Sequence, residues 1–324
     1  MGRAKVIACQ NTNDKVRSKS SSGGMFPLFA EEILDKEGVV YGAAFTPEFS
    51  IQHIRITNKK DIPALQSSKY AFGSLGTAYK DCKADLESGR SVLFSGTPCQ
   101  IAGLKKFLQK EYDNLYLIDF ICHGTPALST WNQYLKELAG DKKILSVNFR
   151  DKRNGWTEYN LTVKFTDGTE YSVNHNKDPY LSAFVSEITL RNCCYRCQFK
   201  GVYNRSSDIT LGDLWGAKEL ATDIFDDKGT SLLIISTEKG EKLIHHIKNS
   251  IQTSEIDAEK AFSINWAAVK SAKPSIYKPL FDKCIKKHKA LIPLLNRFLR
   301  PTFIQKCENK VYRKIHRKIH GKLQ

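Results

Sequence analysis

The sequence is poor in long apolar stretches. None of the hydrophobic runs in its 324 residues approaches the roughly 20 consecutive apolar residues that a helix needs to cross a membrane. The first nine residues hold a positive charge and a short apolar run, but they lack the hydrophobic segment of an export signal. We therefore expect a cytoplasmic protein, and we expect its nine cysteines to be reduced thiols or metal ligands and not disulfides.

Acidic residues are scarce near the end of the chain. Residues 265–324 hold 12 Lys and 4 Arg against only Asp282 and Glu308, so they carry +14 of the net charge of +16. The rest of the chain is close to neutral, which excludes a uniformly basic protein. We expect two parts, a main domain over residues 1–262 and a basic helical tail over residues 263–324.

The tail mixes short apolar groups with lysines. Val311, Ile315 and Ile319 are spaced to share one face of a helix surrounded by cations. Such a helix could lie on an anionic membrane surface, dock an acidic partner protein, or form a solvated end. The tail lacks an aromatic stacking platform, so we expect no nucleic acid among the partners. A location at the inner membrane surface therefore rests on the tail alone.

Short apolar segments alternate with helical patterns through most of the chain. Residues 91–94 and 115–120 read as buried strands, and each is followed by a helix, as in a parallel sheet. Asp167 and Gly168 predict the turn of a hairpin between residues 159–165 and 169–173. The sequence therefore predicts an α/β fold with a mixed, largely parallel central sheet, flanking helices and an inserted antiparallel hairpin.

Four cysteines are placed as if to share one centre. Cys194 and Cys197 form a C-x-x-C pair, while Cys99 and Cys122 each come just after a predicted strand. Ligands bind at this edge of open α/β sheets. Four thiolates suit either a [4Fe–4S] cluster or a tetrahedral zinc ion, and the isolated positions of two of them favour the cluster. Cys193 is a spare thiol or an alternate ligand.

Three further features have both a functional and a plain interpretation. The loop of Ser21, Ser22, Gly23 and Gly24 precedes a predicted helix, whose free N–H groups could bind a phosphate, but such loops are also ordinary helix starts. Lys69 could face a phosphate or an anionic ring, or be a solvated lysine. His123, beside Cys122, could donate a proton or a hydrogen bond, or be a structural histidine.

Several short motifs occur in a characteristic order. They are Ser20–Gly24, Val40–Phe45, Ser68–Tyr70, Phe94–Gln100, Cys122–Gly124, Phe149–Asp151 with Gly155 and Trp156, Cys194–Gly201 and Ser207–Gly216. With them the chain resembles the beta subunit family of coenzyme F420 hydrogenases and dehydrogenases over about residues 5–220. The Cys-rich ferredoxin-like segment that many relatives carry at the N-terminus has no counterpart before Lys5.

The resemblance implies an oxidoreductase that passes electrons between a small-molecule hydride donor or acceptor, FAD and a [4Fe–4S] cluster. It also implies a ferredoxin-like or other electron-transfer protein as partner, and a surface-polysaccharide pathway as one context. The residues that it implicates are Cys99, Cys122, Cys194 and Cys197 as cluster ligands, Ser21, Ser22, Gly23, Gly24, Lys69 and Thr97 at the FAD, and Lys69 and His123 as catalytic groups. The alternative is a non-catalytic zinc-binding or interaction protein on the same fold.

Overall fold

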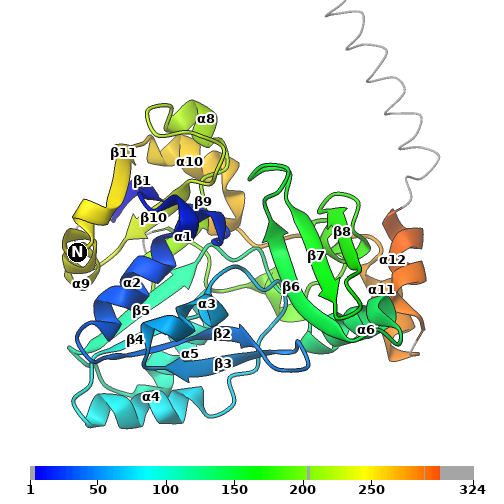
Figure 1. Cartoon of the computed structure of the whole chain (residues 1–324), viewed down its shortest axis with the longest axis horizontal. Helices are drawn as coiled ribbons and strands as arrows, with labels where there is room; N and C mark the ends of the chain where they lie inside the picture. The colour runs from blue at the N-terminus through cyan, green and yellow to red at the C-terminus, as the bar shows by residue number, and fades with distance from the viewer. Residues whose placement is uncertain (1–3, 203–204, 288, 300–324) are drawn as a thin grey trace, which may run out of the picture.

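The computed structural model describes residues 4–202, 205–287 and 289–299. Two sheets organise the chain (Figure 1). The larger has eight strands in the order β11-β1-β10-β9-β5-β4-β2-β3, and the smaller has three in the order β6-β7-β8. The predicted fold class, a mixed α/β sheet with flanking helices and a separate antiparallel unit, is confirmed.

The strands are short, as expected for a sheet buried on both faces. They are β1 (Lys5–Asn11), β2 (Val39–Phe45), β3 (Ile51–Ile56), β4 (Val92–Ser95), β5 (Leu115–Phe120), β6 (Ile144–Asp151), β7 (Asn160–Phe165), β8 (Glu170–Asn174), β9 (Ile209–Asp213), β10 (Ser231–Ile235) and β11 (Ile251–Glu255). The helices are α1 (Asp14–Ser18), α2 (Met25–Leu34), α3 (Ile62–Leu65), α4 (Ala78–Glu87), α5 (Pro98–Leu108), α6 (Leu128–Ala139), α7 (Pro179–Val185), α8 (Ala217–Leu220), α9 (Glu238–His246), α10 (Ala258–Ile264), α11 (Lys278–Lys286) and α12 (Leu291–Leu299). Single 3-10 turns are η1 (Lys59–Asp61), η2 (Asn192–Arg196), η3 (Lys248–Ser250) and η4 (Trp266–Ala268).

Five strands of the large sheet, β1, β2, β4, β5 and β9, run in one direction. The pairs β2–β4, β4–β5 and β5–β9 are parallel, whereas β10, β11 and β3 run antiparallel to their neighbours. All four residues of β4 are buried, because helices cover both faces of the sheet at its centre. Strand β3 lies at the edge and has both buried and exposed residues.

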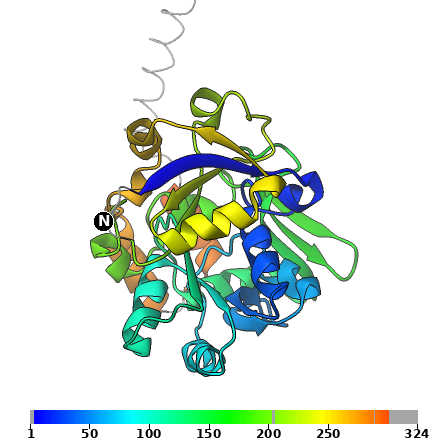
Figure 2. The ribbon, with the colours of Figure 1, turned by 90° about the vertical axis from the view of Figure 1, so that its left-hand side faces the viewer.

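Helices cover the two faces of the large sheet with separate apolar cores. On one face, α2, α3 and α9 pack on the sheet through residues such as Phe29, Ile33 and Leu243; Figure 2 shows α9 and α2 on the same side. On the other face, α4 and α5 pack through Leu86 and Leu104. The carboxyl ends of β4 and β5 are left facing the space between the two sheets.

The small sheet forms its own unit with helices α6, α7, α11 and α12. Its core is rich in aromatic side chains, and the rings of Trp131 and Phe149 lie 4.5 Å apart between centroids. Tyr180 packs edge-on against Trp131 at 5.2 Å. This unit lies beside the large sheet in Figure 1, and it includes the predicted hairpin as β7 and β8.

The beginning of the basic tail belongs to this core. Leu291 and Leu295 of α12 are fully buried, and Phe298 stacks on Tyr277 at 5.4 Å. The carboxylate of Glu137 accepts the backbone N–H of Leu291 at 2.7 Å and so caps α12. The apolar groups of α12 therefore contact the protein itself. The division at residue 262 stays a prediction.

The helix that was predicted from Val311, Ile315 and Ile319 lies outside the described residues. Within the part of the chain that is described, no helix is both long and apolar enough to cross a membrane.

Helix α1 and strand β11 are among the elements that were not predicted. Helix α1 occupies the polar stretch before the Ser-Gly loop, with Asn13 as its N-cap. Strand β11 has the polar sequence Ile251–Glu255 and pairs with β1 at the edge of the sheet. Residues 148–151 are the last part of β6 and pair with β7 across a bulge.

Candidate functional site

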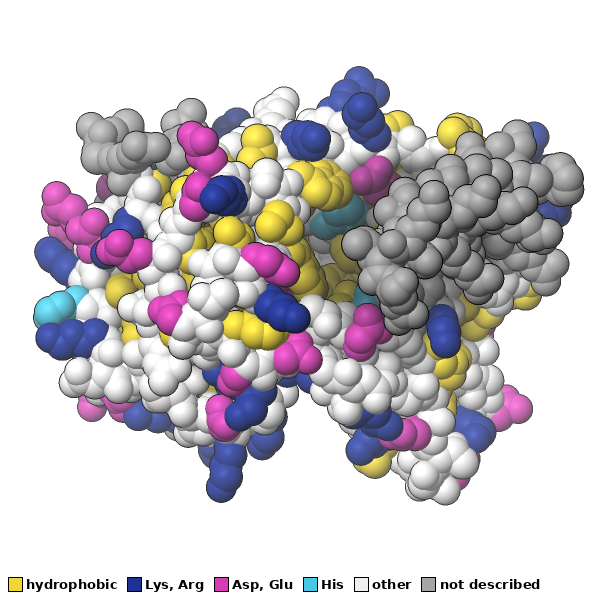
Figure 3. Space-filling model, turned by 90° about the horizontal axis from the view of Figure 1, so that it is seen from above, with side chains coloured by type: hydrophobic (Ala, Val, Ile, Leu, Met, Phe, Trp, Pro, Cys, Tyr) yellow, Lys and Arg dark blue, Asp and Glu magenta, His cyan; other side chains and the backbone are white. Residues whose placement is uncertain are grey.

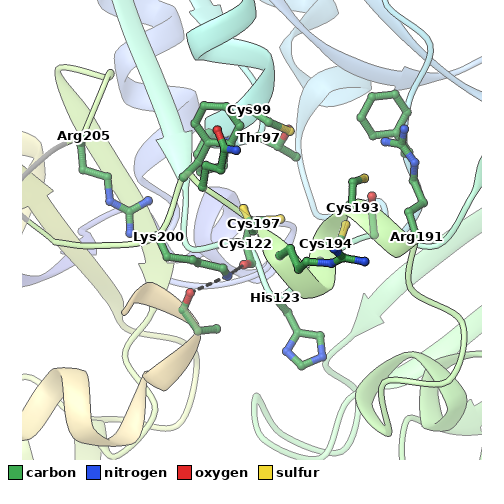
Figure 4. A pocket seen from close by; sticks show the side chains of 18 residues that line it. Thr97, Cys99, Cys122, His123, Arg191, Cys193, Cys194, Cys197, Lys200 and Arg205 are labelled. Atoms are coloured by element: carbon green, nitrogen blue, oxygen red, sulfur yellow. Dashed lines mark hydrogen bonds between the residues drawn. The ribbon is translucent and has the colours of Figure 1, made fainter. Parts of the chain in front are cut away.

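A pocket lined by five cysteines lies at the carboxyl ends of β4 and β5. Its volume is about 210 Å³, and its lining includes Cys99, Cys122, Cys193, Cys194 and Cys197 (Figure 4). They come from three parts of the chain, namely the first turn of α5, the loop after β5, and the turn η2 with the residue after it. The structure therefore brings the four predicted ligands together and adds Cys193.

The position of Cys99 follows from the end of β4. Strand β4 is paired with β5 as far as Ser95, and the chain then starts α5 with Thr97 as N-cap and Pro98 in the first turn. Thr97 and Gln100 form a capping box, in which each side chain bonds to the backbone of the other. The Thr97 hydroxyl also lies 3.1 Å from the Cys99 sulfur. Thr97, predicted at the flavin, thus lies in the cysteine pocket.

Gly124 allows the η2 turn to approach the Cys122 loop. A Cβ atom at this position would lie 3.2 Å from the Cβ of Cys194 and 2.9 Å from a methyl group of Leu190. The φ of Gly124, +137°, also disfavours any residue other than glycine. The backbone N–H of Arg191 donates to the carbonyl of Thr125 at 2.9 Å. These contacts fix the C-x-x-C turn against the sheet.

Residues 266–271 hold the other side of the turn. The backbone N–H of Cys197 donates to the Ser271 hydroxyl at 3.1 Å, and that hydroxyl lies 3.3 Å from the Cys197 carbonyl. The ammonium group of Lys200 donates to the carbonyls of Cys122 and Ala267, the latter at 2.7 Å. Lys200 thereby joins the Cys122 loop to the η4 turn.

The pocket is strongly electropositive. Its lining contains Arg191, Arg196, Lys200 and Arg205, and none of the described residues of the lining is Asp or Glu. Arg205 lies 3.8 Å from the buried carboxylate of Asp119 in β5, behind the pocket. Burial raises the pKa of Asp119 to about 6, although Arg205 opposes that shift.

Two thiols of the pocket, those of Cys122 and Cys194, favour their protonated form when no metal is bound. Burial raises the pKa of Cys122 to about 12, and burial also raises the pKa of Cys194. Metal coordination displaces such protons, because the thiolate is the form that binds. The surrounding cations would stabilise the resulting negative charge.

His123 lines the pocket, but its ring points away from the cysteines (Figure 4). The ring packs edge-on against Phe184 at 5.2 Å and Trp266 at 5.3 Å. Burial lowers its pKa to about 4, so the imidazole is neutral at pH 7, and its Nε2 is buried without a hydrogen-bond partner. A neutral histidine in this orientation is a weak candidate for a proton donor to the thiols.

The predicted Ser-Gly loop forms a second site between β1 and α2. The Ser21 hydroxyl donates to the Ser68 hydroxyl at 2.8 Å and accepts the Ser68 backbone N–H at 2.7 Å. The Ser22 hydroxyl donates to the carbonyl of Thr230 at 2.8 Å. Both serine hydroxyls are therefore engaged inside the protein, and Ser21 ties the loop to the stretch that carries Lys69.

The two glycines bring this loop against the sheet and onto α2. A Cβ at Gly23 would lie 2.4 Å from the carbonyl oxygen of Cys9, so only glycine fits there. Gly24 is the N-cap of α2 and offers no side chain to its first turn. The N–H groups at the start of α2 are thus a candidate anion site next to Ser21 and Ser22.

Cations lie close to this loop. The Lys69 ammonium donates to the carbonyls of Gln66 and Ser67 at 3.0 and 3.1 Å and lies 5.7 Å from the centre of the Phe45 ring. Burial lowers its pKa to about 7. Lys152 donates to the carbonyl of Arg17 at 2.8 Å, and its pKa is lowered to about 8 by burial and then by neighbouring arginines.

Aromatic rings connect the two sites. Tyr70, next to Lys69, lies 5.2 Å from Phe184 between ring centroids, and Phe184 lies 5.2 Å from His123. The rings of Tyr70 and His123 are thus no more than about 10 Å apart. The face seen in Figure 3 is hollowed near its centre, with hydrophobic and histidine side chains at depth.

Comparisons with known proteins agree with this arrangement. The family profile for the C-terminal part of the coenzyme F420 hydrogenase/dehydrogenase beta subunit matches residues 89–259, which is more than half of the chain. The chain belongs to this family. A solved structure of the F420-reducing [NiFe] hydrogenase complex from Methanosarcina barkeri, made for xenon derivatization, contains a chain of similar fold, with a TM-score of 0.54 and 13% identity over 82% of this chain and 91% of that one. No curated protein matches the sequence.

The pocket of this beta-subunit family member has cysteines as candidate ligands for a metal centre. Among residues 4–202, 205–287 and 289–299, no three or more His, Cys, Asp or Glu side chains converge as they would on one metal ion. A tetrahedral zinc would require thiolates about 3.8 Å apart, because each Zn–S bond is about 2.3 Å long. A cluster binds each thiolate through a different iron and so separates them around a larger body. The cysteines of the lining are the donor set that either group would need.

Sequence reasoning missed the cations of the beta-subunit pocket. Arg191 and Arg196 flank the cysteine motif, and Lys200 lies three residues after Cys197, so closeness to the motif was an available signal. Arg205 had no such signal. Its approach to Asp119 depends on how β5 and the segment before β9 come together.

Proposed function

We propose that this protein is an oxidoreductase that uses FAD and a [4Fe–4S] cluster to pass electrons between a small-molecule hydride donor or acceptor and an electron-transfer protein. Membership of the family supports a redox role. The observation that carries the finer proposal is the pocket itself, where four cysteines far apart in the sequence meet among four cations without any carboxylate in the lining.

In this proposal Cys99, Cys122, Cys194 and Cys197 hold the cluster. A bound cluster exchanges single electrons and a bound flavin exchanges a hydride, and the protein sets their positions and potentials. Lys200 and the arginines of the lining offset the negative charge of four thiolates. The Thr97 hydroxyl lies 3.1 Å from the Cys99 sulfur, and it would stabilise the thiolate form if it donated a hydrogen bond to it.

The flavin would bind at the Ser-Gly loop. The uncapped N–H groups at Gly24 and the start of α2 would bind its pyrophosphate, and Lys69 and Lys152 would balance charge nearby. The hydroxyls of Ser21 and Ser22 already donate hydrogen bonds within the protein, so these serines would shape the loop. The backbone N–H groups would then bind the pyrophosphate. Lys69 would stabilise an anionic reduced flavin.

His123 has a narrower role here than the sequence suggested. Its ring contacts Phe184 and Trp266 at one wall of the pocket and is neutral, so it would exclude water and support the wall. A cytoplasmic location, a tail at the inner membrane surface and a surface-polysaccharide pathway stay predictions.

Anaerobic purification tests the proposal. We expect flavin absorbance near about 450 nm, a broad cluster band near about 400 nm, and about four irons and four sulfides per chain. Replacing Cys99, Cys122, Cys194 or Cys197 by serine should remove most of the iron and leave the flavin. Cys193→Ser is the matched control and should keep both.

Metal analysis of the purified protein can reject the cluster or its proposed ligands. Stoichiometric zinc without iron would establish the alternative zinc-binding protein. Equal iron loss in Cys193→Ser and Cys194→Ser would reject the proposed ligand set.

A further inference from the structure

A buried ion pair lies directly behind the cysteine pocket. Asp119 of β5 and Arg205, in the segment before β9, have side chains that are only 1% and 3% exposed. Arg205 belongs to the lining of the pocket, whereas Asp119 does not. The pair therefore places two opposite charges away from water, with the positive charge on the side of the cysteines.

The carboxylate of Asp119 has a fixed position. Asp119 pairs with Thr210 in the parallel ladder between β5 and β9, and the Thr210 hydroxyl donates a hydrogen bond to Oδ1. Oδ2 is buried without a hydrogen-bond partner among the described residues and lies 3.8 Å from Nη1 of Arg205. One oxygen thus anchors the carboxylate, and the other faces the guanidinium.

The guanidinium of Arg205 keeps hydrogen-bond donors for the pocket. Nη2 donates to the carbonyl of Ala268 in η4 at 3.2 Å, which is the only hydrogen bond of this side chain to the described residues. Nε is buried without a partner among them. Because a guanidinium has five N–H groups and unpaired buried donors are costly, an acceptor inside the pocket would stabilise this arrangement.

Lys200 is anchored next to Arg205. Its ammonium group donates to the carbonyl of Ala267 at 2.7 Å, and Arg205 donates to the carbonyl of the following residue, Ala268. Lys200 also donates to the carbonyl of Cys122, and Figure 4 shows both cationic groups at this side of the pocket. The two cations therefore act on the same thiolates, but only Arg205 has a buried carboxylate behind it.

We propose that Asp119 and Arg205 together set the reduction potential of a metal centre held by the pocket cysteines. This inference rests on the proposed function, because it concerns the cluster that the four cysteine ligands would hold. Arg205 stabilises negative charge added at the thiolates and so favours the reduced form. Asp119 positions Arg205 and offsets part of its charge, which limits the rise in potential. Reduction adds one electron to the centre from a reductant such as dithionite, and neither side chain is itself oxidised or reduced.

The two residues should shift the potential in opposite directions. Arg205→Met removes the cation and should lower the fraction of reduced centre. Asp119→Asn keeps an oxygen for the guanidinium but removes the negative charge, so it should raise that fraction. A pair that only supported the fold would not produce opposite signs. The double variant leaves no unpaired buried charge, so it should fold even where a single variant is unstable.

Redox titration of the anaerobically purified full-length protein at pH 8 tests the pair, because the pKa of Asp119 is about 6 and the carboxylate is ionised there. At a fixed solution potential, the ratio of reduced to oxidised centre should fall about tenfold in Arg205→Met, which is about 59 mV for one electron. It should rise at least threefold in Asp119→Asn. Arg205→Lys, which keeps the charge, should change it less than Arg205→Met, and the double variant should lie between the two single ones.

The matched control removes the same charges from another ion pair. Arg55 of β3 bonds to Asp85 of α4 through two hydrogen bonds of 2.8 Å, and neither residue lines the pocket. Strands β2 and β4 separate β3 from β5. Arg55→Met and Asp85→Asn should each change the ratio less than twofold. Shifts of the same sign in Arg205→Met and Asp119→Asn, or equal shifts in the control pair, would overturn the proposal.

Cobalt binding separates this inference from the proposed function. Metal-free protein is titrated with Co²⁺, and absorbance of the Co²⁺–thiolate bonds reports binding. Thiolates around a divalent ion are also a net anion, so the Kd should rise at least threefold in Arg205→Met and fall in Asp119→Asn. These opposite changes in a protein that purifies without iron or flavin would reject the function and support the pair. The same Kd in the wild type and both variants would overturn the pair, whatever the iron content.

Discussion

The lowered pKa of Lys69 makes flavin binding depend on pH in a specific way. Burial brings the pKa to about 7 in the protein without ligand, so Lys69 is about half protonated at neutral pH. An anionic group beside the ammonium would favour the charged form and return the pKa toward its ordinary value of about 10.4. Binding would then take up a proton at every pH between these two values.

The size of the effect follows from this linkage. Above pH 7 the fraction of charged Lys69 in the free protein falls tenfold per pH unit, and the Kd for FAD rises by the same factor. Between pH 6 and pH 9 the Kd should rise about a hundredfold, which corresponds to about 2.7 kcal/mol. Binding is therefore tightest below pH 7 and is lost as the pH rises.

Two substitutions make the test specific to Lys69. Flavin-free protein is titrated with FAD between pH 6 and pH 9, and flavin fluorescence reports binding. Lys69→Arg keeps a charge at every pH in this range, since the guanidinium stays protonated, so its Kd should be nearly flat. Lys69→Gln should bind weakly throughout. A flat wild-type profile, or a slope in Lys69→Arg equal to that of the wild type, would refute the reasoning.

Three further predictions test the pocket and the fold. Gly124→Ala should displace η2, because the new Cβ would meet Leu190 and take a strained φ, and iron analysis should show loss of iron with flavin retained. Leu295 is fully buried, so Leu295→Ala should lower the free energy of unfolding, measured by urea denaturation, by about 2–5 kcal/mol. The control is Asn296→Ala at the exposed neighbouring position, which should change that free energy by less than about 0.5 kcal/mol. Burial lowers the pKa of His53, so the unfolded chain binds more protons than the folded protein below pH 6.5, and the free energy of unfolding should fall as the pH drops through that value. Unfolding of His53→Gln measured across pH 5–8 should show a smaller fall. A pH slope identical to that of the wild type would contradict the prediction.

Sequence patterns predicted the part of the site that depends on local structure. Cys99 and Cys122 follow two buried strands that proved to be parallel neighbours, so their meeting was a consequence of strand order. The Ser-Gly loop could be found because glycine and hydroxyl residues precede a clear helix. These features are visible over ten or fifteen residues.

Features that depend on distant partners could not be predicted in the same way. Strand β11 has the polar sequence Ile251–Glu255, and it exists because β1 offers it an open edge. Lys200 has an ordinary position in the sequence, and its role arises from carbonyls at residues 122 and 267. Nothing local to α12 indicates that Glu137 caps this helix, because that carboxylate lies 154 residues earlier in the chain.

The place of β1 in the sheet has a consequence for how the protein is made. This strand is synthesised before its two neighbours, β10 and β11, so its pairing is incomplete until residue 255 has been made. At about 5–20 residues per second, that interval is on the order of ten to fifty seconds. Gly23 packs against β10 as well, so the loop proposed to hold the flavin takes shape only after Ser231 has been made. Flavin loading at this loop would therefore follow the synthesis of β10.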